Sequence, residues 1–150
     1  MGNTYTSLHY HVVFGTKGRE PWITRELEER IWSYMAAIAR DNAMTALQIG
    51  GVEDHVHILL RAPATMALSK MAQLIKGGSS GWIRKTFPER KDFQWQDGYG
   101  AFTVSRSSIG DVTEYIRNQR EHHRVKTFQE EYLAFLQRHE IDFDPRYVWD

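Results

Sequence analysis

The feature that most constrains this chain is the residue-by-residue alternation of residues 6–16 (TSLHYHVVFGT). Only an extended strand places every second side chain on the same face, so this segment predicts a β-strand. One face would carry Leu8, Tyr10, Val12 and Phe14, and the other would carry His9, His11 and Val13.

Residues 53–60 (EDHVHILL) predict a second strand with a more unusual content. His55 and His57 are two residues apart, so their rings point to the same face of that strand. Two imidazoles side by side can hold one divalent cation and leave room for further ligands. A solvent-facing pair without a function is an equally weighted alternative. Glu53 and Asp54, just before the motif, could lie near the cation, although a solvated turn is the more common explanation.

The remaining elements follow from periodicity and from turn residues. We expect first a long amphipathic helix over 23–43, and then two strands within 44–62 joined around 50–54. A helix over 65–77 follows, and residues 77–92 should form a flexible Gly/Ser patch and a short basic helix or loop. The rest of the chain predicts one or two short strands within 93–105, a helix over 107–124, a short helix over 128–141 and an extended end over 142–150.

This order, βαββαβα followed by a C-terminal helix, predicts an α+β class. It matches the ferredoxin-like, split βαβ arrangement, in which helices pack on one face of an antiparallel sheet. A chain of 150 residues suits one domain, and neither a linker nor a repeat divides it, so we expect a single domain over 1–150.

Composition excludes several classes of protein. The chain has no cysteine, which rules out disulfides, thiolate zinc sites and a cysteine nucleophile and suits a reducing cytoplasm. No apolar run approaches the roughly 20 residues that span a bilayer, so no membrane partner is expected.

The net charge of zero conceals a basic middle, because residues 61–91 contain seven Lys or Arg and one acid, Glu89. Such a segment weakly favours a polyanionic partner, although a solvated helical face is the more common explanation. Aromatic rings interleave the basic residues and would let unpaired bases stack, unless they belong to the core. The candidate DNA-binding residues are Lys70, Lys76, Trp82, Arg84 and Lys85.

The predicted helix over 107–124 carries a tyrosine and an amide on one face. Tyr115 and Gln119 are four residues apart, and His122 lies near the same face. Packed on the sheet, this helix would bring a nucleophile and a neutral oxygen ligand to the strand histidines. Taken singly, Tyr115 suits the edge of a core and Gln119 a solvated helix surface.

These residues carry a resemblance to a known family. HVHILL resembles the HUH motif (histidine, bulky apolar residue, histidine), and the spacing from Tyr115 to Gln119 resembles the catalytic helix of single-tyrosine HUH transposases. That family includes insertion-sequence transposases and REP-associated tyrosine transposases. Segments 10–23, 75–85, 93–105 and 112–123 are similar to the family in order and spacing, so the resemblance covers nearly the whole chain.

The resemblance implies a DNA transposase, an endonuclease and strand transferase. His55, His57 and Gln119 would bind Mg²⁺ or Mn²⁺, and Tyr115 would attack single-stranded or hairpin DNA to form a 5′-phosphotyrosine and a free 3′-OH. The covalent bond conserves the energy for rejoining, so no nucleotide cofactor is needed. The resemblance further implies a homodimer and a nucleoid-associated protein in the cytoplasm of a bacterium or archaeon.

Two other classes remain open. A non-catalytic, RRM-like nucleic-acid-binding module would have incidental histidines, although the aromatic platform of such modules is not visible. A zinc-dependent hydrolase would want a third histidine or a carboxylate in place of Gln119.

His9 and His11 are expected to be structural or to face DNA, rather than to be ligands.

Overall fold

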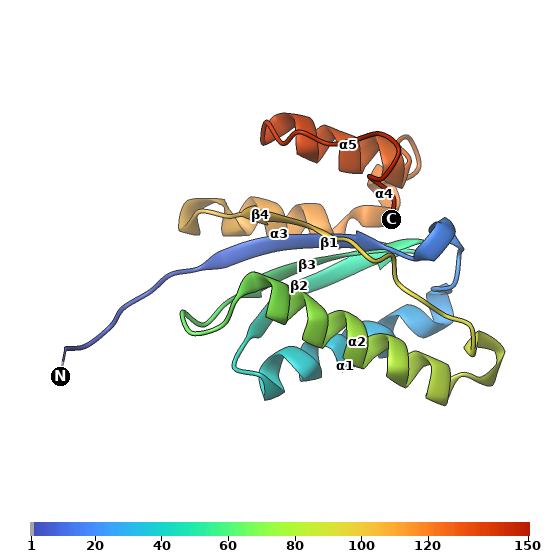
Figure 1. The fold of residues 1–150 in the computed structure, drawn as a ribbon, viewed down its shortest axis with the longest axis horizontal. Coiled ribbons are helices and arrows are strands. Elements are labelled where there is room, and N and C mark those ends of the chain that lie inside the picture. Colours follow the sequence, from blue (N-terminus) through green and yellow to red (C-terminus); the bar gives the residue numbers. More distant parts are fainter. Residues whose placement is uncertain (1) are drawn as a thin grey trace.

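The computed structural model describes residues 2–150 as a four-stranded antiparallel sheet with helices on both of its faces (Figure 1). The strands are β1 (His9–Gly15), β2 (Thr45–Val52), β3 (His55–Arg61) and β4 (Gly100–Thr103), in the spatial order β2-β3-β1-β4. The helices are α1 (Arg25–Asp41), α2 (Leu68–Thr86), α3 (Ile109–Arg117), α4 (Gln119–His122) and α5 (Phe128–Arg138), with short 3-10 turns at Lys17–Arg19, Pro88–Arg90 and Arg106–Ser108. The predicted α+β class and element order are confirmed.

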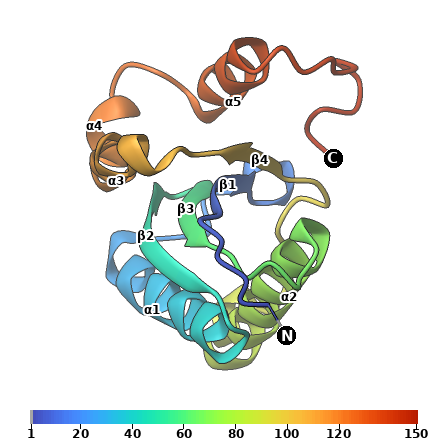
Figure 2. The same ribbon diagram turned by 90° about the vertical axis from the view of Figure 1, so that its left-hand side faces the viewer.

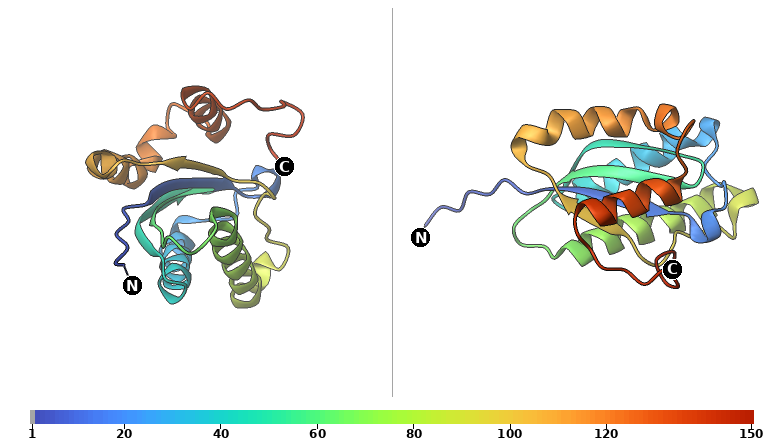
Figure 3. Two further views of the ribbon diagram at one scale, coloured as in Figure 1. Left: turned by 60° about the vertical axis from the view of Figure 1, so that its left-hand side comes forward. Right: turned by 90° about the horizontal axis from the view of Figure 1, so that it is seen from above.

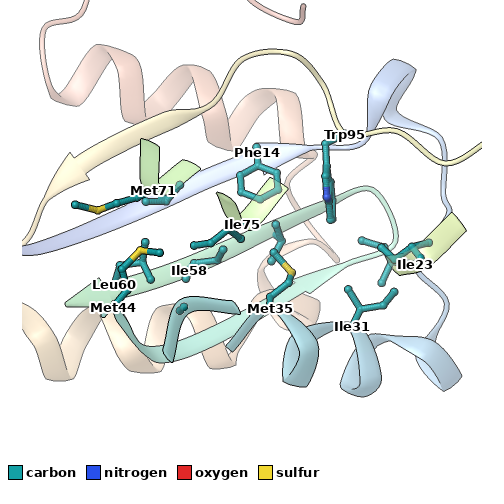
Figure 4. Close-up of a cluster of buried hydrophobic side chains, with 14 of the residues drawn as sticks. Phe14, Ile23, Ile31, Met35, Met44, Ile58, Leu60, Met71, Ile75 and Trp95 are labelled. Atoms are coloured by element: carbon teal, nitrogen blue, oxygen red, sulfur yellow. The ribbon is translucent and has the colours of Figure 1, made fainter. Parts of the chain in front are cut away.

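One face of the sheet holds the larger core. The alternation of β1 and β3 sends Val12 and Ile58 to this face. The helices α1 and α2 cover it (Figure 2), and Figure 4 shows Ile58 among the buried side chains. The other buried members of this cluster include Phe14, Ile23, Ile31, Met35, Met44, Val56, Leu60, Met71, Ile75 and Trp95. The apolar sides of both predicted strands therefore meet the two long helices.

The opposite face is also covered, which corrects the expectation that the helices pack on one face only. α3 lies over β2 and β3, and α5 lies above the sheet on the same side (Figures 2 and 3). A second cluster joins α5 to this face through Val13, Phe102, Phe128, Tyr132, Phe135 and Leu136. The histidine side of the sheet is therefore an interior surface.

The prediction of a flexible Gly/Ser patch is wrong, because α2 runs through residues 77–81 without a break. Ser79 is buried there, and its hydroxyl donates to the carbonyl of Ile75 (2.6 Å) and accepts from the indole N–H of Trp95 (2.9 Å). A Cβ on Gly78 would lie 2.8 Å from Ile38 of α1, so glycine at this position permits close packing of the two helices. These long-range contacts override the low helix propensity of glycine.

The segment 93–105 forms one strand, β4, and a single bridge between Trp95 and Thr16, which agrees with the expected one or two short strands. The expected helix over 107–124 is interrupted at Asn118, which leaves the helical region (φ −98°, ψ 29°) and separates α3 from α4. No helix within residues 2–150 is both long and apolar enough to cross a membrane.

Candidate metal centre

Sheet pairing and one glycine position the centre. β3 lies between β1 and β2, and the rings of His55 and His57 on its inner side are fully buried. Gly50 of β2 is the cross-strand partner of His57, and a Cβ at Gly50 would lie 2.4 Å from the carbonyl oxygen of Ile116. The missing side chain lets α3 lie directly on the sheet, which brings Tyr115 to the histidines.

Each histidine of the pair is held through its Nδ1 atom. The Nδ1–H of His55 donates to Asp54 Oδ1 (2.8 Å), and Nδ1 of His57 is hydrogen-bonded to Nε2 of His11 (2.8 Å). Such partners fix the orientation of metal-binding histidines in proteins. Asp54 and His11 thus orient the pair, whereas Glu53 forms an ion pair with Arg120 away from it (3.0 Å).

The Nε2 atoms of His55 and His57 lie close to several other atoms that could bind a metal ion, which we call metal-donor atoms. Gln119 Oε1 lies 3.1 Å from Nε2 of His55, and Glu131 Oε1 lies 2.8 Å from Nε2 of His57. Nε2 of His123 lies 3.0 Å from Gln119 Oε1 and 3.3 Å from Glu131 Oε1. The donor atoms of the three histidines and the glutamate all lie within 4.8 Å of one another.

This arrangement fits a divalent cation. Donors about 2.1 Å from one ion are separated by roughly 3.0–3.4 Å, depending on the coordination geometry. The separations between neighbouring donors here run from 2.8 to 3.5 Å. Because Nδ1 of His55 is held by Asp54, its Nε2 points at the oxygens of Gln119 and Glu131. A cation between these nitrogen and oxygen atoms would stabilise the group.

The protonation states of His57 and Glu131 suit metal binding, which needs neutral imidazole and ionised carboxylate, whereas the raised pKa of His123 favours its protonated form. Burial lowers the pKa of His57 to about 4, so its ring is neutral at pH 7. Burial acts to raise the pKa of Glu131, but hydrogen bonds from His123 and His57 and the charges of the histidines outweigh it and hold that pKa well below its usual range. Burial likewise opposes a charge on His123, yet Glu131 raises the pKa of His123.

Tyr115 reaches this centre within the same chain. Its hydroxyl donates to Glu131 Oε2, and its ring lies 5.8 Å from the ring of His57, centroid to centroid. The ring of His122 stacks on it at 4.5 Å. Burial, followed by the charge of Glu131, raises the pKa of the half-buried Tyr115 hydroxyl above its ordinary value.

The structure therefore brings together the four residues predicted as site residues, and it adds two that sequence reasoning missed. His123 was missed although it follows Gln119 by four residues, which is one helical turn, and its Nε2 lies 3.0 Å from Gln119 Oε1. Glu131 was missed although it left a signal. It is an acid on the apolar face of the last helix, next to Tyr132 and three residues after Phe128.

The candidate DNA-binding residues all lie on α2, across the sheet from this centre. Two of them support a loop, since the ammonium of Lys76 donates to the carbonyls of Asp97 (2.7 Å) and Gly98 (2.9 Å), and Arg84 donates to that of Phe93 (3.0 Å).

The other candidates on α2 differ in their surroundings. Trp82 stacks on Tyr34 at 4.3 Å and is partly buried, whereas Lys70 and Lys85 are exposed. Lys76 and Arg84 line a groove of about 690 Å³. The structure does not bring these five residues to the metal centre.

Comparisons with known proteins identify a family and several relatives. Residues 4–119 match the family described as "Transposase IS200 like". The chain is 26% identical to the ISDra2 transposase TnpA of Deinococcus radiodurans over 117 residues, which are 75% of this chain and 84% of that protein. It is also 26% identical to the transposase for insertion sequence element IS200 of Salmonella typhimurium over 131 residues, or 83% and 85% of the two chains.

Solved structures share the fold. A candidate transposase from Deinococcus radiodurans R1 superposes with a TM-score of 0.65 at 26% identity, over 79% of this chain and 96% of that one. A REP-associated tyrosine transposase bound to a REP hairpin superposes with a TM-score of 0.60 over 82% and 73% of the two chains. At 13% identity the second likeness speaks for the fold alone.

Proposed function

Because this chain belongs to the family of IS200-like transposases, we propose that it cuts and rejoins single-stranded or hairpin DNA through a covalent bond to Tyr115. One observation carries the proposal: within one chain, Glu131 links the hydroxyl of Tyr115 to the histidines that face a common point. A relative of similar fold is bound to a REP hairpin, which supports DNA as the partner.

The course of the reaction is the one that the resemblance to single-tyrosine HUH transposases implies. The hydroxyl of Tyr115 loses its proton as its oxygen forms a bond to the phosphorus of a phosphodiester, and the bond from phosphorus to the 3′ oxygen breaks. The 3′ oxygen takes up a proton and leaves as a hydroxyl, while the 5′ phosphate stays on the tyrosine. Attack by a 3′-OH reverses these steps and rejoins a strand, so no nucleotide cofactor is required.

His55, His57 and Gln119 would hold Mg²⁺ or Mn²⁺. A bound ion supplies positive charge to the phosphate oxygens as negative charge develops on them. Asp54 and His11 orient the two rings. Because the pKa of Tyr115 is raised, its hydroxyl keeps its proton at pH 7, and Glu131 accepts the hydrogen bond that aims it.

We also propose that each tyrosine serves the histidines of its own chain, since Tyr115 reaches His57 without a second subunit. The homodimer remains a prediction from the resemblance. The exposed Lys70 and Lys85 are proposed to bind DNA phosphates away from the reacting group.

The test is to incubate the protein with single-stranded and hairpin oligonucleotides from the flanks of its own gene and Mg²⁺ or Mn²⁺. A covalent adduct should appear on a denaturing gel, and mass spectrometry should locate it on Tyr115. Tyr115→Phe should abolish the adduct, whereas Tyr132→Phe, which removes a hydroxyl from neighbouring α5, should not. Adducts that persist in Tyr115→Phe would disprove the assignment, and binding without cleavage in any divalent ion would favour the RRM-like alternative.

A second function gains support from the two residues that the sequence analysis missed. A zinc-dependent hydrolase wants a third histidine or a carboxylate, and His123 and Glu131 supply both. Family membership and the position of Tyr115 favour the transposase. Zn²⁺-dependent hydrolysis that survives Tyr115→Phe and leaves no adduct would reverse this preference.

A further inference from the structure

We propose that Glu131 is an anionic ligand of the divalent ion and also positions Tyr115, so that metal binding holds helix α5 in place over the centre. This inference rests on the proposed function, and it extends the donor set to a part of the chain outside the family-matched residues 4–119. His123 and Glu131 both lie beyond that segment.

The first argument is burial. Glu131 is 2% exposed and lies on the inner side of α5, where Phe128 stacks on the ring of His55 at 4.4 Å. A buried carboxylate is costly unless charged or hydrogen-bonding groups surround it. Those groups are Nε2 of His57 (2.8 Å), Nε2 of His123 (3.3 Å) and the Tyr115 hydroxyl.

The second argument is the charge of the donor set. His55, His57 and Gln119 are neutral ligands and leave both positive charges of an ion uncompensated. Mg²⁺ and Mn²⁺ prefer carboxylate oxygens over imidazole nitrogens. Glu131 Oε1 provides such an oxygen at 2.8 Å from His57 Nε2 and 3.5 Å from His55 Nε2, on either side of the roughly 3.0–3.4 Å expected between ligands of one ion.

The third argument concerns the two oxygens of the carboxylate. Oε1 faces the histidines, while Oε2 accepts from the Tyr115 hydroxyl and from the amide of Gln119 (3.4 Å). One side chain therefore relates the nucleophile to the metal donors. This makes Glu131 a positioning residue for Tyr115.

A consequence follows for the C-terminal helix. α5 meets the sheet through side chains such as Phe135, whose ring lies 5.1 Å from that of His11, and Glu131 lies in the middle of that contact. If the ion binds Glu131 only when α5 is docked, docking must strengthen metal binding and metal must stabilise docking by the same free energy. Mn²⁺ should then slow amide hydrogen exchange in residues 128–138.

The experiment measures Mn²⁺ binding by isothermal titration calorimetry and hydrogen exchange of α5, both without DNA. Glu131→Gln should weaken Mn²⁺ binding about tenfold or more and remove the Mn²⁺-dependent protection of α5. Glu130→Gln is the matched control. It removes the same charge from the adjacent, exposed position and can keep the capping box with Thr127, so both readouts should be unchanged.

If Glu131→Gln does not fold, Glu131→Asp replaces it, because this variant keeps the charge but withdraws the carboxylate by one methylene; it should also bind Mn²⁺ more weakly. Unchanged Mn²⁺ affinity in the variant that folds would overturn the inference. His57→Ala separates the two proposals: if it abolishes Mn²⁺ binding while Glu131→Gln has no effect, the inference fails and the proposed metal site stands. If His57→Ala binds Mn²⁺ normally, the proposed site itself is wrong.

Discussion

Replacement of Gly50 by alanine tests how the tyrosine helix is positioned. Gly50 lies on β2 beside His57, and the backbone of Ile116 in α3 occupies the space above it. A Cβ at Gly50 would lie 2.4 Å from the Ile116 carbonyl oxygen, about 1 Å closer than the 3.4 Å of an ordinary contact. The obstacle is backbone, so a rotamer change cannot relieve it, and α3 must move away from the sheet.

This displacement sets the expected magnitude. Overpacking of a tight interface costs about 1–3 kcal/mol of unfolding free energy. For a chain of this size, each kcal/mol lowers the melting temperature by roughly 2–4 °C. A shift of about 1 Å in a reacting group typically reduces rate by about 10²-fold. Gly50→Ala should therefore lower stability modestly and slow adduct formation by Tyr115 far more.

The assay compares thermal unfolding with single-turnover adduct formation at saturating oligonucleotide and Mn²⁺. Gly110→Ala is the control, because Gly110 lies in the first turn of the same helix and has open space where a Cβ would point. It should leave the rate unchanged and add up to about 1 kcal/mol of stability. If Gly50→Ala unfolds and reacts as the unaltered protein does, contact between Ile116 and β2 does not position the tyrosine.

Two further predictions concern the histidines. Burial lowers the pKa of His57 from 6.5 to about 4, so between these pH values the unfolded chain binds a proton that the folded chain excludes. The melting temperature should therefore fall as pH is lowered from 6.5 towards 4. A melting temperature that stays constant over that range would contradict a neutral, buried His57. His11→Ala removes the partner of Nδ1 of His57 and should weaken Mn²⁺ binding about 10–100-fold in calorimetry. His139→Ala, at the residue that follows α5, should not weaken it. Equal affinities of His11→Ala and the unaltered protein would show that His57 needs no such partner.

Part of the centre could be predicted because the relevant geometry is local. A period of two puts His55 and His57 on one face of a strand wherever that strand lies, and a spacing of four puts Tyr115 and Gln119 one helical turn apart. The second relation survives the break at Asn118, since the amide of Gln119 still lies 3.4 Å from the carbonyl of Tyr115. The resemblance then linked the two motifs, and the fold brings them into contact.

The errors share a physical cause, which is contact between residues distant in the sequence. Propensity favours a flexible segment at 77–81, but packing of α1 against Gly78 and the bond from Trp95 to Ser79 hold it helical. The predicted DNA-binding role of the basic residues of α2 stays a prediction, and the fold adds that Lys76 and Arg84 also donate to carbonyls of a loop 9–22 residues away.

By itself, then, the sequence determined which side chains share a face: the apolar and histidine sides of β1 and β3, and the pairing of Tyr115 with Gln119. Tertiary structure alone decided that helices cover both faces of the sheet, that His11 and Asp54 orient the histidine pair, and that Glu131 reaches them from α5. The reason is that the repeat of side-chain directions along a strand or a helix depends on a few consecutive residues only. A buried carboxylate acquires its partners only when the sheet and the last helix pack together.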